Sequence, residues 1–378
     1  MRHRTCELLI CPGRAGAPPC AGGLAPSEGG LPARRAVEAP DELLEGTLAC
    51  DRCGAEYPVI SGVLILVRDV SAYLTRYCRA VLSSAALHGT VSDDLARWLE
   101  RHHPDAPGLP AADQPLDVNL PGSMDRLSDL VGGDARYGTF AKFVREWQGR
   151  SPYDRLASFA RTLEAPQGLA VDSGCGAGAM ALRLAPMARY VLGVDHAFSA
   201  VLLARRLLLH QPRPKEDYEL RRSAEAYELR STARALAAAA PTSGAGGPPL
   251  GNADFIVADS MDLPLADGSA ALVAGANILE TDSLRATLRE SSRVLQQGGL
   301  LLLTDPFKAA PAVFSDAAAD PVASLRRFLA GLDLRVEVEE DFVPWIQYQY
   351  DRHFQVHLNY CAAARKSSPG GEVPHPAA

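Results

Sequence analysis

Short apolar runs alternate with amphipathic helical patterns through residues 168–305, and this order constrains the fold more than any other feature of the chain. The apolar runs cover residues 168–172, 190–195, 254–259, 271–277 and 300–305, and the helical patterns cover residues 179–188, 200–210 and 283–295. Strands that alternate with helices form parallel sheets, because each helix carries the chain back across one face of the sheet. We therefore predict an α/β fold with helices on both faces of a parallel sheet.

The end of the chain departs from this alternation. Residues 334–340 and 354–365 have the character of strands, and only a loop is expected between them. Two strands joined directly by a loop form an antiparallel pair. Residues 212–251 are a low-complexity mixture of Ala, Arg, Glu, Gly and Pro, which predicts a surface insertion, and residues 367–378 predict a disordered tail.

A glycine-rich turn follows the first predicted strand, in the sequence VDSGCGAGAMALRLA. Gly174, Gly176 and Ala179 fit the dinucleotide fingerprint G-x-G-x-x-G/A, whereas Gly174, Gly176 and Gly178 fit the G-x-G-x-G turn of enzymes that use S-adenosylmethionine (SAM). Glycine is needed because the backbone must approach the ligand closely, in conformations that a Cβ would forbid. The turn by itself leaves both nucleotides open.

Three carboxylates lie at the ends of three successive predicted strands, and they help to choose between the nucleotides. Asp172 precedes the glycine turn, where a carboxylate would repel a pyrophosphate but attract the amino group of a methionine moiety, which favours SAM. Asp195 is placed to hold both ribose hydroxyls of either nucleotide. Asp259 is placed to accept a hydrogen bond from the adenine amino group, with Ser260 beside it and Met261 over the ring.

The segments VDSGCGAG, VLGVD, VADSMDLPLADGSAALV and RVLQQGGLLLLTD occur in that order, and together they resemble a class I SAM-dependent methyltransferase of the type 11 kind. The resemblance implies a Rossmann-like sheet of seven strands with an antiparallel last strand, in agreement with the predicted C-terminal pair. The insertion interrupts the match without changing the site, because loops tolerate insertions. The implied SAM-binding residues are Asp172, Gly174, Gly176, Gly178, Asp195, Asp259, Ser260, Met261 and Asn277.

The N-terminal part of the chain contains a candidate zinc site. Cys50 and Cys53 form a C-x-x-C knuckle in ACDRCGAEYPV, and tetrahedral zinc needs a second pair of ligands. Cys11 and Cys20, in LLICPGRAGAPPCAGGL, are the expected pair, although they are spaced more widely than the usual two to four residues. Pro and Gly between them let the loop bulge out and return, and Cys6 is the reserve ligand.

This stretch resembles the small Trm112-like zinc-ribbon domain, through LLICP, CAGGL, L-x-C-x-x-C-G-x-x-Y-P-V and I-S-G-V-L-I-L. The resemblance implies a structural zinc ion, closed by four thiolates and without an open position for catalysis. It also implies that the ribbon binds a protein partner or steadies an adjacent methyltransferase. We predict a zinc-ribbon domain over residues 1–70, a helical linker or lid over 71–150 and a methyltransferase domain over 151–366.

The composition limits the classes of partner. The formal net charge of -7 gives no global attraction to nucleic acid or to an anionic membrane. No apolar run approaches the roughly 20 residues that span a bilayer, and the start of the sequence lacks the apolar core of a signal peptide. We therefore predict a cytoplasmic protein, in which cysteines serve as metal ligands or buried residues rather than in disulfides.

The methyl acceptor leaves no specific motif. The segment GANILETD lacks an N-P-P-Y-type tetrapeptide, which argues against amino-group methylation of the adenine or glutamine kind. Ligands bind at the carboxyl ends of strands in α/β sheets, and the residues predicted there are Asn277, Glu280, Asp305, Trp345 and Tyr348. His353, at the end of the predicted loop 341–353, is the candidate general base.

These observations favour a SAM-dependent methyltransferase that acts on a small, neutral acceptor. The runner-up is an RNA methyltransferase, because a zinc ribbon ahead of such a core also resembles bacterial large-subunit rRNA guanine-N1 methyltransferases. The excess of acidic residues and the lack of a basic patch interleaved with aromatic residues argue against a nucleic-acid substrate. A local basic face is nevertheless compatible with a negative net charge. A non-catalytic partner protein is the third alternative, and the intact turn with its carboxylates argues against it.

Overall fold

The computed structural model describes residues 1–27, 30–36, 41–87, 97–98, 151–209, 250–278, 284–307, 320–350 and 353–367. Most of the predicted helical linker or lid over 71–150, most of the insertion at 212–251 and the tail after residue 367 lie outside these ranges. Among the described residues, no helix is both long and apolar enough to cross a membrane.

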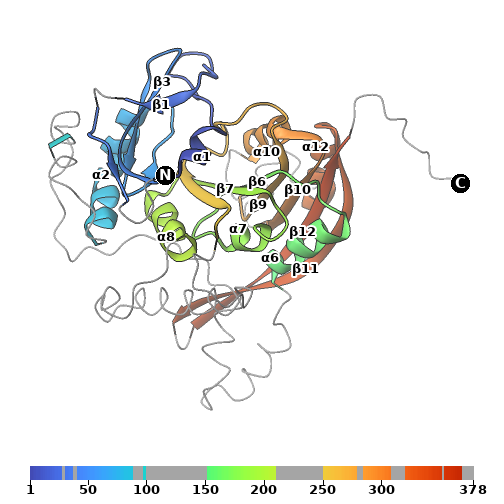
Figure 1. Ribbon diagram of the computed structural model, residues 1–378. Helices are drawn as coiled ribbons and strands as arrows, with labels where there is room; N and C mark the ends of the chain where they lie inside the picture. Colours follow the sequence, from blue (N-terminus) through green and yellow to red (C-terminus); the bar gives the residue numbers. More distant parts are fainter. Residues whose placement is uncertain are drawn as a thin grey trace, which may run out of the picture.

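The predicted α/β fold is confirmed, with a mixed seven-stranded sheet in the order β11-β12-β10-β9-β6-β7-β8 (Figure 1). The strands are β6 (Leu169–Ser173), β7 (Tyr190–Asp195), β8 (Ala253–Val257), β9 (Ala270–Ala276), β10 (Leu295–Asp305), β11 (Leu334–Tyr350) and β12 (His353–Lys366). Strands β6 to β10 are parallel to their neighbours in this group, whereas β12 is antiparallel to both β10 and β11. The predicted antiparallel last strand is therefore also present.

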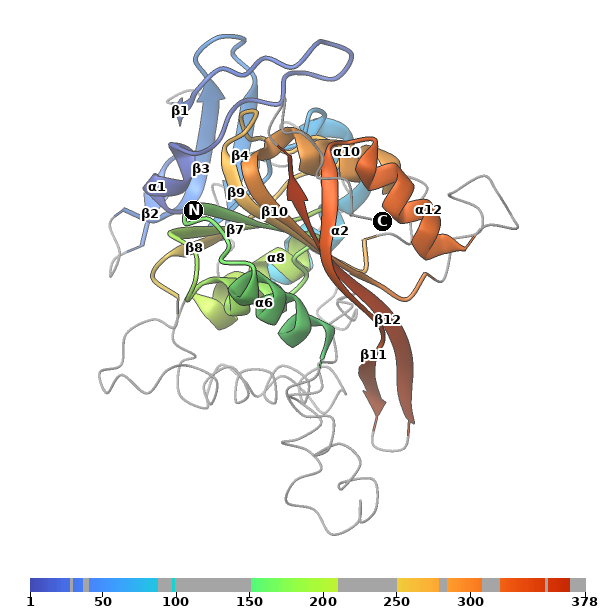
Figure 2. The ribbon, with the colours of Figure 1, turned by 90° about the vertical axis from the view of Figure 1, so that its right-hand side faces the viewer.

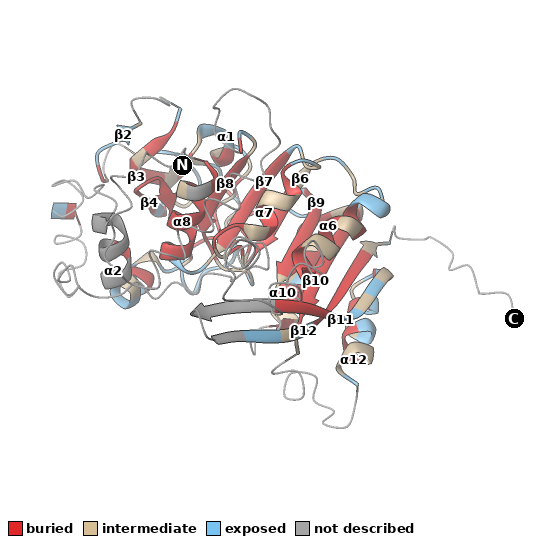
Figure 3. Cartoon of the chain, turned by 90° about the horizontal axis from the view of Figure 1, so that it is seen from below, coloured by how far each residue is buried: buried red, intermediate tan, exposed pale blue. Residues whose placement is uncertain are grey.

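Helices cover both faces of this sheet, whose parallel strands β6 to β10 are almost entirely buried, as the red colour in Figure 3 shows. On one face lie α6 (Pro152–Thr162), α7 (Ala179–Leu184) and α8 (Phe198–Leu208). On the other face lie α10 (Leu284–Val294) and α12 (Pro321–Ala330). The parallel strands are buried on both sides, which explains why they are continuous apolar runs rather than alternating patterns.

The C-terminal hairpin corrects one prediction. The expected loop over residues 341–353 is wrong, because both strands continue through it and only residues 351–352 separate β11 from β12. The pairing register shifts between Glu340 and Val343, which marks an irregularity where Phe342 has a φ of 58°. Such a bulge bends a strand without ending it. The hairpin consequently extends well past the neighbouring strands (Figure 2).

The N-terminal part forms a second, smaller sheet, which is preceded by the short helix α1 (His3–Cys6). Its strands are β1 (Leu24–Pro26), β2 (Arg34–Arg35), β3 (Leu43–Cys50), β4 (Glu56–Ile60) and β5 (Val63–Leu64). Strands β4 and β5 are separated by a turn at Ser61 and Gly62, whose φ angles are 52° and 81°. The chain then enters α2 (Val70–Leu87), as the helical pattern after residue 70 predicted.

This small sheet is attached to the edge of the large one. The Leu66 N–H donates to the Val257 carbonyl at 2.8 Å, and Ile65 forms a parallel bridge with Val257. The chain after β5 thus extends the seven-stranded sheet beyond its edge strand β8. Val63 and Ile65 join the apolar core on the α8 face, whereas Leu64 and Leu66 join the core on the opposite face. The two sheets therefore share their hydrophobic cores.

A buried charge cluster joins the same two parts. Arg205 of α8 is 1% exposed and forms ion pairs with Glu42 of the small sheet region and with Asp254 of β8. Asp254 also accepts hydrogen bonds from the Thr5 hydroxyl at 2.7 Å and from the Arg2 backbone N–H at 2.9 Å. Charges enter a protein interior only when they are paired, so this cluster fixes the position of the N-terminal part on β8.

Candidate functional site

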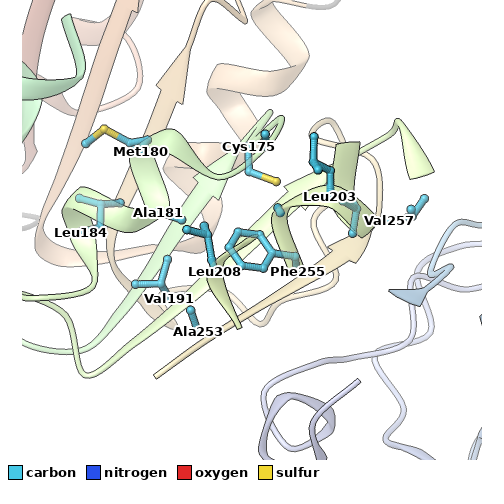
Figure 4. Close-up of a cluster of buried hydrophobic side chains, with 14 of the residues drawn as sticks. Cys175, Met180, Ala181, Leu184, Val191, Leu203, Leu208, Ala253, Phe255 and Val257 are labelled. Carbon is cyan, nitrogen blue, oxygen red and sulfur yellow. The ribbon is translucent and has the colours of Figure 1, made fainter. Parts of the chain in front are cut away.

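The glycine turn lies between β6 and α7. Gly174, Gly176 and Gly178 have φ angles of 72°, 49° and 86°, in the left-handed region that favours glycine. A Cβ on Gly178 would lie 2.4 Å from Leu208 Cδ1 and 3.1 Å from Phe255 Cε1, so packing as well as conformation requires glycine there. Figure 4 shows Leu208 and Phe255 side by side in the core near α7.

The third small residue of the turn distinguishes the two fingerprints. Gly178 takes the special conformation, whereas Ala179 is simply the first residue of α7. The turn therefore has the G-x-G-x-G spacing that we associated with SAM, and Ala179 does not replace its third glycine.

Asp195 joins the end of β7 to the glycine turn. Its Oδ2 accepts from the Gly176 N–H at 2.8 Å, and its Oδ1 accepts from the Ala197 N–H at 2.8 Å. Each carboxylate oxygen has a second lone pair, so the side chain can still accept from the hydroxyls of a ribose. The structure thus brings Asp195 and the turn together, as the sequence predicted.

Asp172 lies deeper than expected. It is 1% exposed, and its Oδ2 accepts from the Ala181 N–H of α7 at 2.8 Å. Burial raises the pKa of Asp172 to about 7, against the smaller, opposing effect of the Ala181 hydrogen bond. The carboxyl group therefore faces α7, and its contact with a methionine amino group remains a prediction.

Asp259 forms a tight turn after β8. Its Oδ1 accepts from the Met261 N–H at 2.8 Å, and its carbonyl accepts from the Asp262 N–H at 3.0 Å. Ser260 is half-buried in this turn, and Met261 is 43% exposed, which is unusual for a large apolar side chain. An exposed methionine beside the turn is suited to cover a flat ring, as we predicted for adenine.

Asn277 follows β9 in a left-handed conformation, with a φ of 57°. Its backbone N–H donates to the Thr304 carbonyl at 2.8 Å, and its Oδ1 accepts from Asn359 Nδ2 at 3.0 Å. Asn359 also donates to Thr304 Oγ1 at 3.0 Å. Sequence reasoning missed Asn359 and Thr304, although a buried asparagine in the apolar strand FQVHLNYCAAAR was a usable signal.

The other predicted acceptor-side residues are not brought together as a loop cluster. Asp305 is fully buried and accepts from the Phe307 N–H at 2.7 Å. Trp345 is buried within β11, with its ring 5.4 Å from that of His357. His353 begins β12 and pairs with Tyr350, so it belongs to a hairpin strand rather than to the expected loop. Glu280 and the Tyr348 side chain lie outside the described residues.

The four predicted zinc ligands converge at the far end of the small sheet. The sulfur atoms of Cys11, Cys20, Cys50 and Cys53 all lie within 4.8 Å of one another. The Cys11–Cys53 and Cys20–Cys50 sulfur pairs are each 3.6 Å apart. A tetrahedral zinc–thiolate site, with bonds of about 2.3 Å, has sulfur–sulfur edges of about 3.8 Å. The reserve ligand, Cys6, is not part of this cluster.

Backbone and side-chain donors surround these sulfur atoms. Burial acts to raise the pKa of Cys50, but the Cys53 and Arg52 N–H groups and the neighbouring thiols lower it to about 7. The Tyr57 hydroxyl lies 3.1 Å from the Cys11 sulfur, and the Gly13 N–H donates to the same sulfur at 3.3 Å. Hydrogen bonds of this kind orient thiolate ligands around a metal, so the residues present fit a four-thiolate zinc ion.

Comparison with known proteins connects part of this architecture to a family. Residues 218–303 match the family described as a methyltransferase domain. In the described part of the chain, the match covers β8, the Asp259 turn, β9, α10 and most of β10. It supports a methyltransferase that uses SAM, and it begins after the glycine turn. The comparison with curated proteins gave no match.

Solved structures of low similarity align with part of the chain. The YcgJ protein of Bacillus subtilis is 16% identical over 56% of this chain and 98% of its own, with a TM-score of 0.36. Magnesium protoporphyrin IX methyltransferase of Synechocystis, solved with bound SAH, is 16% identical over 64% of this chain and 94% of its own, with a TM-score of 0.36. A chain from the complex of the Haloferax volcanii Trm112 methyltransferase activator is 15% identical over 66% of this chain and 100% of its own, with a TM-score of 0.38. At these scores, the likenesses do not bear on activity or substrate.

Proposed function

We propose that this protein is a SAM-dependent methyltransferase that transfers the methyl group of SAM to a small, neutral acceptor. The observation that carries the proposal is the contact between Asp195 Oδ2 and the Gly176 N–H at 2.8 Å. Through this contact the Asp195 carboxylate, which we propose binds the ribose, lies against a G-x-G-x-G turn at the carboxyl end of neighbouring parallel strands, where α/β sheets bind nucleotides. The methyltransferase family match over residues 218–303 supports the same function.

Different residues would bind the ribose, the adenine and the amino-acid moiety of SAM. Asp195 would accept from the ribose hydroxyls, and the Asp259 turn with Met261 would hold the adenine. The turn would let the backbone approach the amino-acid moiety, because Gly174, Gly176 and Gly178 carry no Cβ. SAM supplies an already activated methyl group, so the protein mainly has to orient an acceptor for in-line attack.

Asn277 is the best-placed described residue for the acceptor side. Its side-chain oxygen is engaged by Asn359, which leaves the amide N–H groups of Asn277 as donors at the end of β9. The left-handed backbone of Asn277 stores strain, and such residues cluster at functional sites. We propose that Asn277 helps to orient the acceptor, while the role of His353 as general base remains a proposal from sequence.

We further propose that the four cysteines hold a structural zinc ion in a Trm112-like ribbon. The chain directly after the ribbon's last strand is packed against the protein's own β8 edge, through Leu66 and Val257. This arrangement favours the second role that the resemblance implies, in which the ribbon steadies its own methyltransferase sheet. A closed set of thiolates leaves no position for catalysis.

Calorimetric titration with SAM tests the proposed cofactor. Hydrogen bonds to a charged group contribute about 1.5–3 kcal/mol, so Asp195→Ala should weaken SAM binding about tenfold to a hundredfold. Asp341→Ala is the matched control, because Asp341 also accepts from a nearby backbone N–H but lies in the distant hairpin. Equal affinities for wild type and Asp195→Ala, or preferential binding of NADH, would contradict the assignment.

The class of acceptor needs a separate test. An RNA substrate would require several Lys or Arg contacts to phosphates, and its binding would fall steeply as salt increases. Filter binding with total RNA at low and moderate salt should therefore show only weak retention. Tight, salt-sensitive binding, together with transfer of labelled methyl groups into rRNA, would establish the runner-up instead.

A further inference from the structure

The segment between the zinc ribbon and the catalytic sheet makes contacts that neither the ribbon nor the proposed chemistry explains. We call residues 65–77 the strap: it leaves β5, passes the edge of β8 and forms the first two turns of α2. Asp69 begins this helix, with its Oδ1 accepting from the Ala72 N–H at 2.8 Å. The strap therefore has a defined conformation along its length.

One strap contact lies beside the proposed ribose-binding carboxylate. The Tyr73 hydroxyl donates to the carbonyl of His196 at 2.8 Å, and His196 directly follows Asp195. The ring of His196 also meets the rings of Tyr73 and Tyr77 edge-on, with centroids 5.1 Å apart in each pair. Tyr73 is buried, so this contact fixes the backbone that leads out of β7.

A second strap contact lies beside the proposed adenine-binding turn. Arg68 donates from Nε to Asp262 Oδ2 at 2.5 Å and from a terminal nitrogen to Asp262 Oδ1 at 2.9 Å. Asp262 closes the turn that Asp259 opens. A bidentate pair between a guanidinium and a carboxylate restricts both position and direction, so it holds this turn more firmly than a single contact would.

The two contacts converge on one ligand moiety. The strap touches both loops that would recognise the nucleoside, and it holds each of them within three residues of the proposed binding carboxylate. A loop already held in its binding conformation loses less entropy when the ligand binds. From this juxtaposition we propose that Tyr73 and Arg68 are positioning residues for SAM, which act through His196 and Asp262 to preorganise the nucleoside site.

The inference rests on the proposed SAM site, and titration calorimetry of the full chain with S-adenosylhomocysteine tests both separately. Tyr73→Phe removes only a hydroxyl, and loss of one neutral hydrogen bond should weaken binding about threefold to tenfold. Arg68→Gln should weaken it by a similar or larger factor, and the double variant by about the product of the two. Failure of the wild type to bind would overturn the proposed function itself.

Tyr190→Phe is the matched control. Tyr190 lies at the opposite end of the same strand, β7, and its hydroxyl also forms a 2.8 Å hydrogen bond, with Thr5. We expect this variant to lose thermal stability but to keep wild-type affinity. Wild-type affinity in Tyr73→Phe, or an equal loss in Tyr190→Phe, would overturn the inference and leave the SAM assignment intact.

A nucleoside fragment shows which part of the ligand is affected. Methylthioadenosine carries the adenosine without the amino-acid moiety, so Tyr73→Phe should weaken its binding by the same factor as that of S-adenosylhomocysteine. An affinity loss confined to S-adenosylhomocysteine would place the effect at the glycine turn and would refute a role for the strap at the nucleoside loops.

Discussion

The two edges of the seven-stranded sheet use similar arginine–carboxylate pairs in opposite surroundings. At the β8 edge, Arg205 is 1% exposed and Asp254 is 0% exposed, beneath the N-terminal ribbon. At the β11 edge, the side chains of Arg326 and Glu339 are 48% and 33% exposed. Breaking a buried pair leaves a charge without water or partner, whereas breaking an exposed pair lets water replace the partner. We therefore expect the two edges to respond very differently to matched substitutions.

Loss of the proposed zinc ion should reduce stability the most, because the ribbon that packs on the β8 edge would then unfold. Structural zinc contributes apparent binding free energies of about 10–16 kcal/mol in small zinc domains. We expect the Cys50→Ser, Cys53→Ser double variant to lose zinc and to unfold at a lower temperature, with elemental analysis and circular dichroism as measurements. Cys6→Ser is the control, since Cys6 is outside the cluster. Metal-free wild-type protein, purified without chelator, would refute the zinc site.

Breaking the buried cluster should have the next largest effect. Arg205→Ala leaves Glu42 and Asp254 without their arginine in a site that excludes water. Removing one partner of a buried ion pair costs about 3–5 kcal/mol, which urea unfolding can measure. A loss below about 1 kcal/mol would mean that the ribbon does not seal this edge in solution.

Asp172 lies buried between the two edges of the sheet, and its carboxyl group should make the stability of the protein depend on pH. The folded-state pKa of Asp172 is about 7, raised from 3.8, so the folded protein retains a proton that the unfolded chain releases. Stability should therefore fall as pH rises from about 4 to about 7 and become constant above that range. Asp172→Asn should flatten this slope in urea titrations at several pH values. An unchanged slope would show that Asp172 is not the responsible group.

The smallest effect should appear at the β11 edge. Arg326→Ala breaks the exposed pair with Glu339, and exposed pairs contribute about 0–1 kcal/mol. We expect a change in the free energy of unfolding near the limit of detection, and salt should reduce it further. A loss comparable to that of Arg205→Ala would remove the contrast between the two edges.

Local patterns were sufficient to predict the parallel sheet, the glycine turn and the cluster of four cysteines. In each case the signal lies within a few residues: a continuous apolar run, closely spaced glycines or a C-x-x-C knuckle. Cys11 and Cys20 were expected near Cys50 and Cys53 because a tetrahedral zinc ion needs a second pair of ligands, and the structure brings the four cysteines together, while zinc itself remains a proposal.

Features that depend on distant contacts were not predictable in the same way. Nothing near Pro344 indicates a strand, and this residue pairs with Leu358 only because β12 supplies a partner across the hairpin. The sequence did not show that α7 folds over Asp172 and supplies the Ala181 N–H to its carboxyl group. Helix α12 was also missed, although Asp320 and Pro321 form a recognisable helix start.

The passage from β5 along β8 has a consequence for how the protein behaves when it is diluted. A ribbon on a separate polypeptide would occupy this edge only when its concentration exceeded the dissociation constant of the complex. Here Leu66, which pairs with Val257, follows strand β5 within the same chain, so the effective local concentration of the ribbon does not depend on the amount of protein in solution. Turnover per molecule should accordingly stay constant over serial dilution, and no lag for assembly should precede it. Because the ribbon and the sheet belong to one chain, neither can be present in excess of the other.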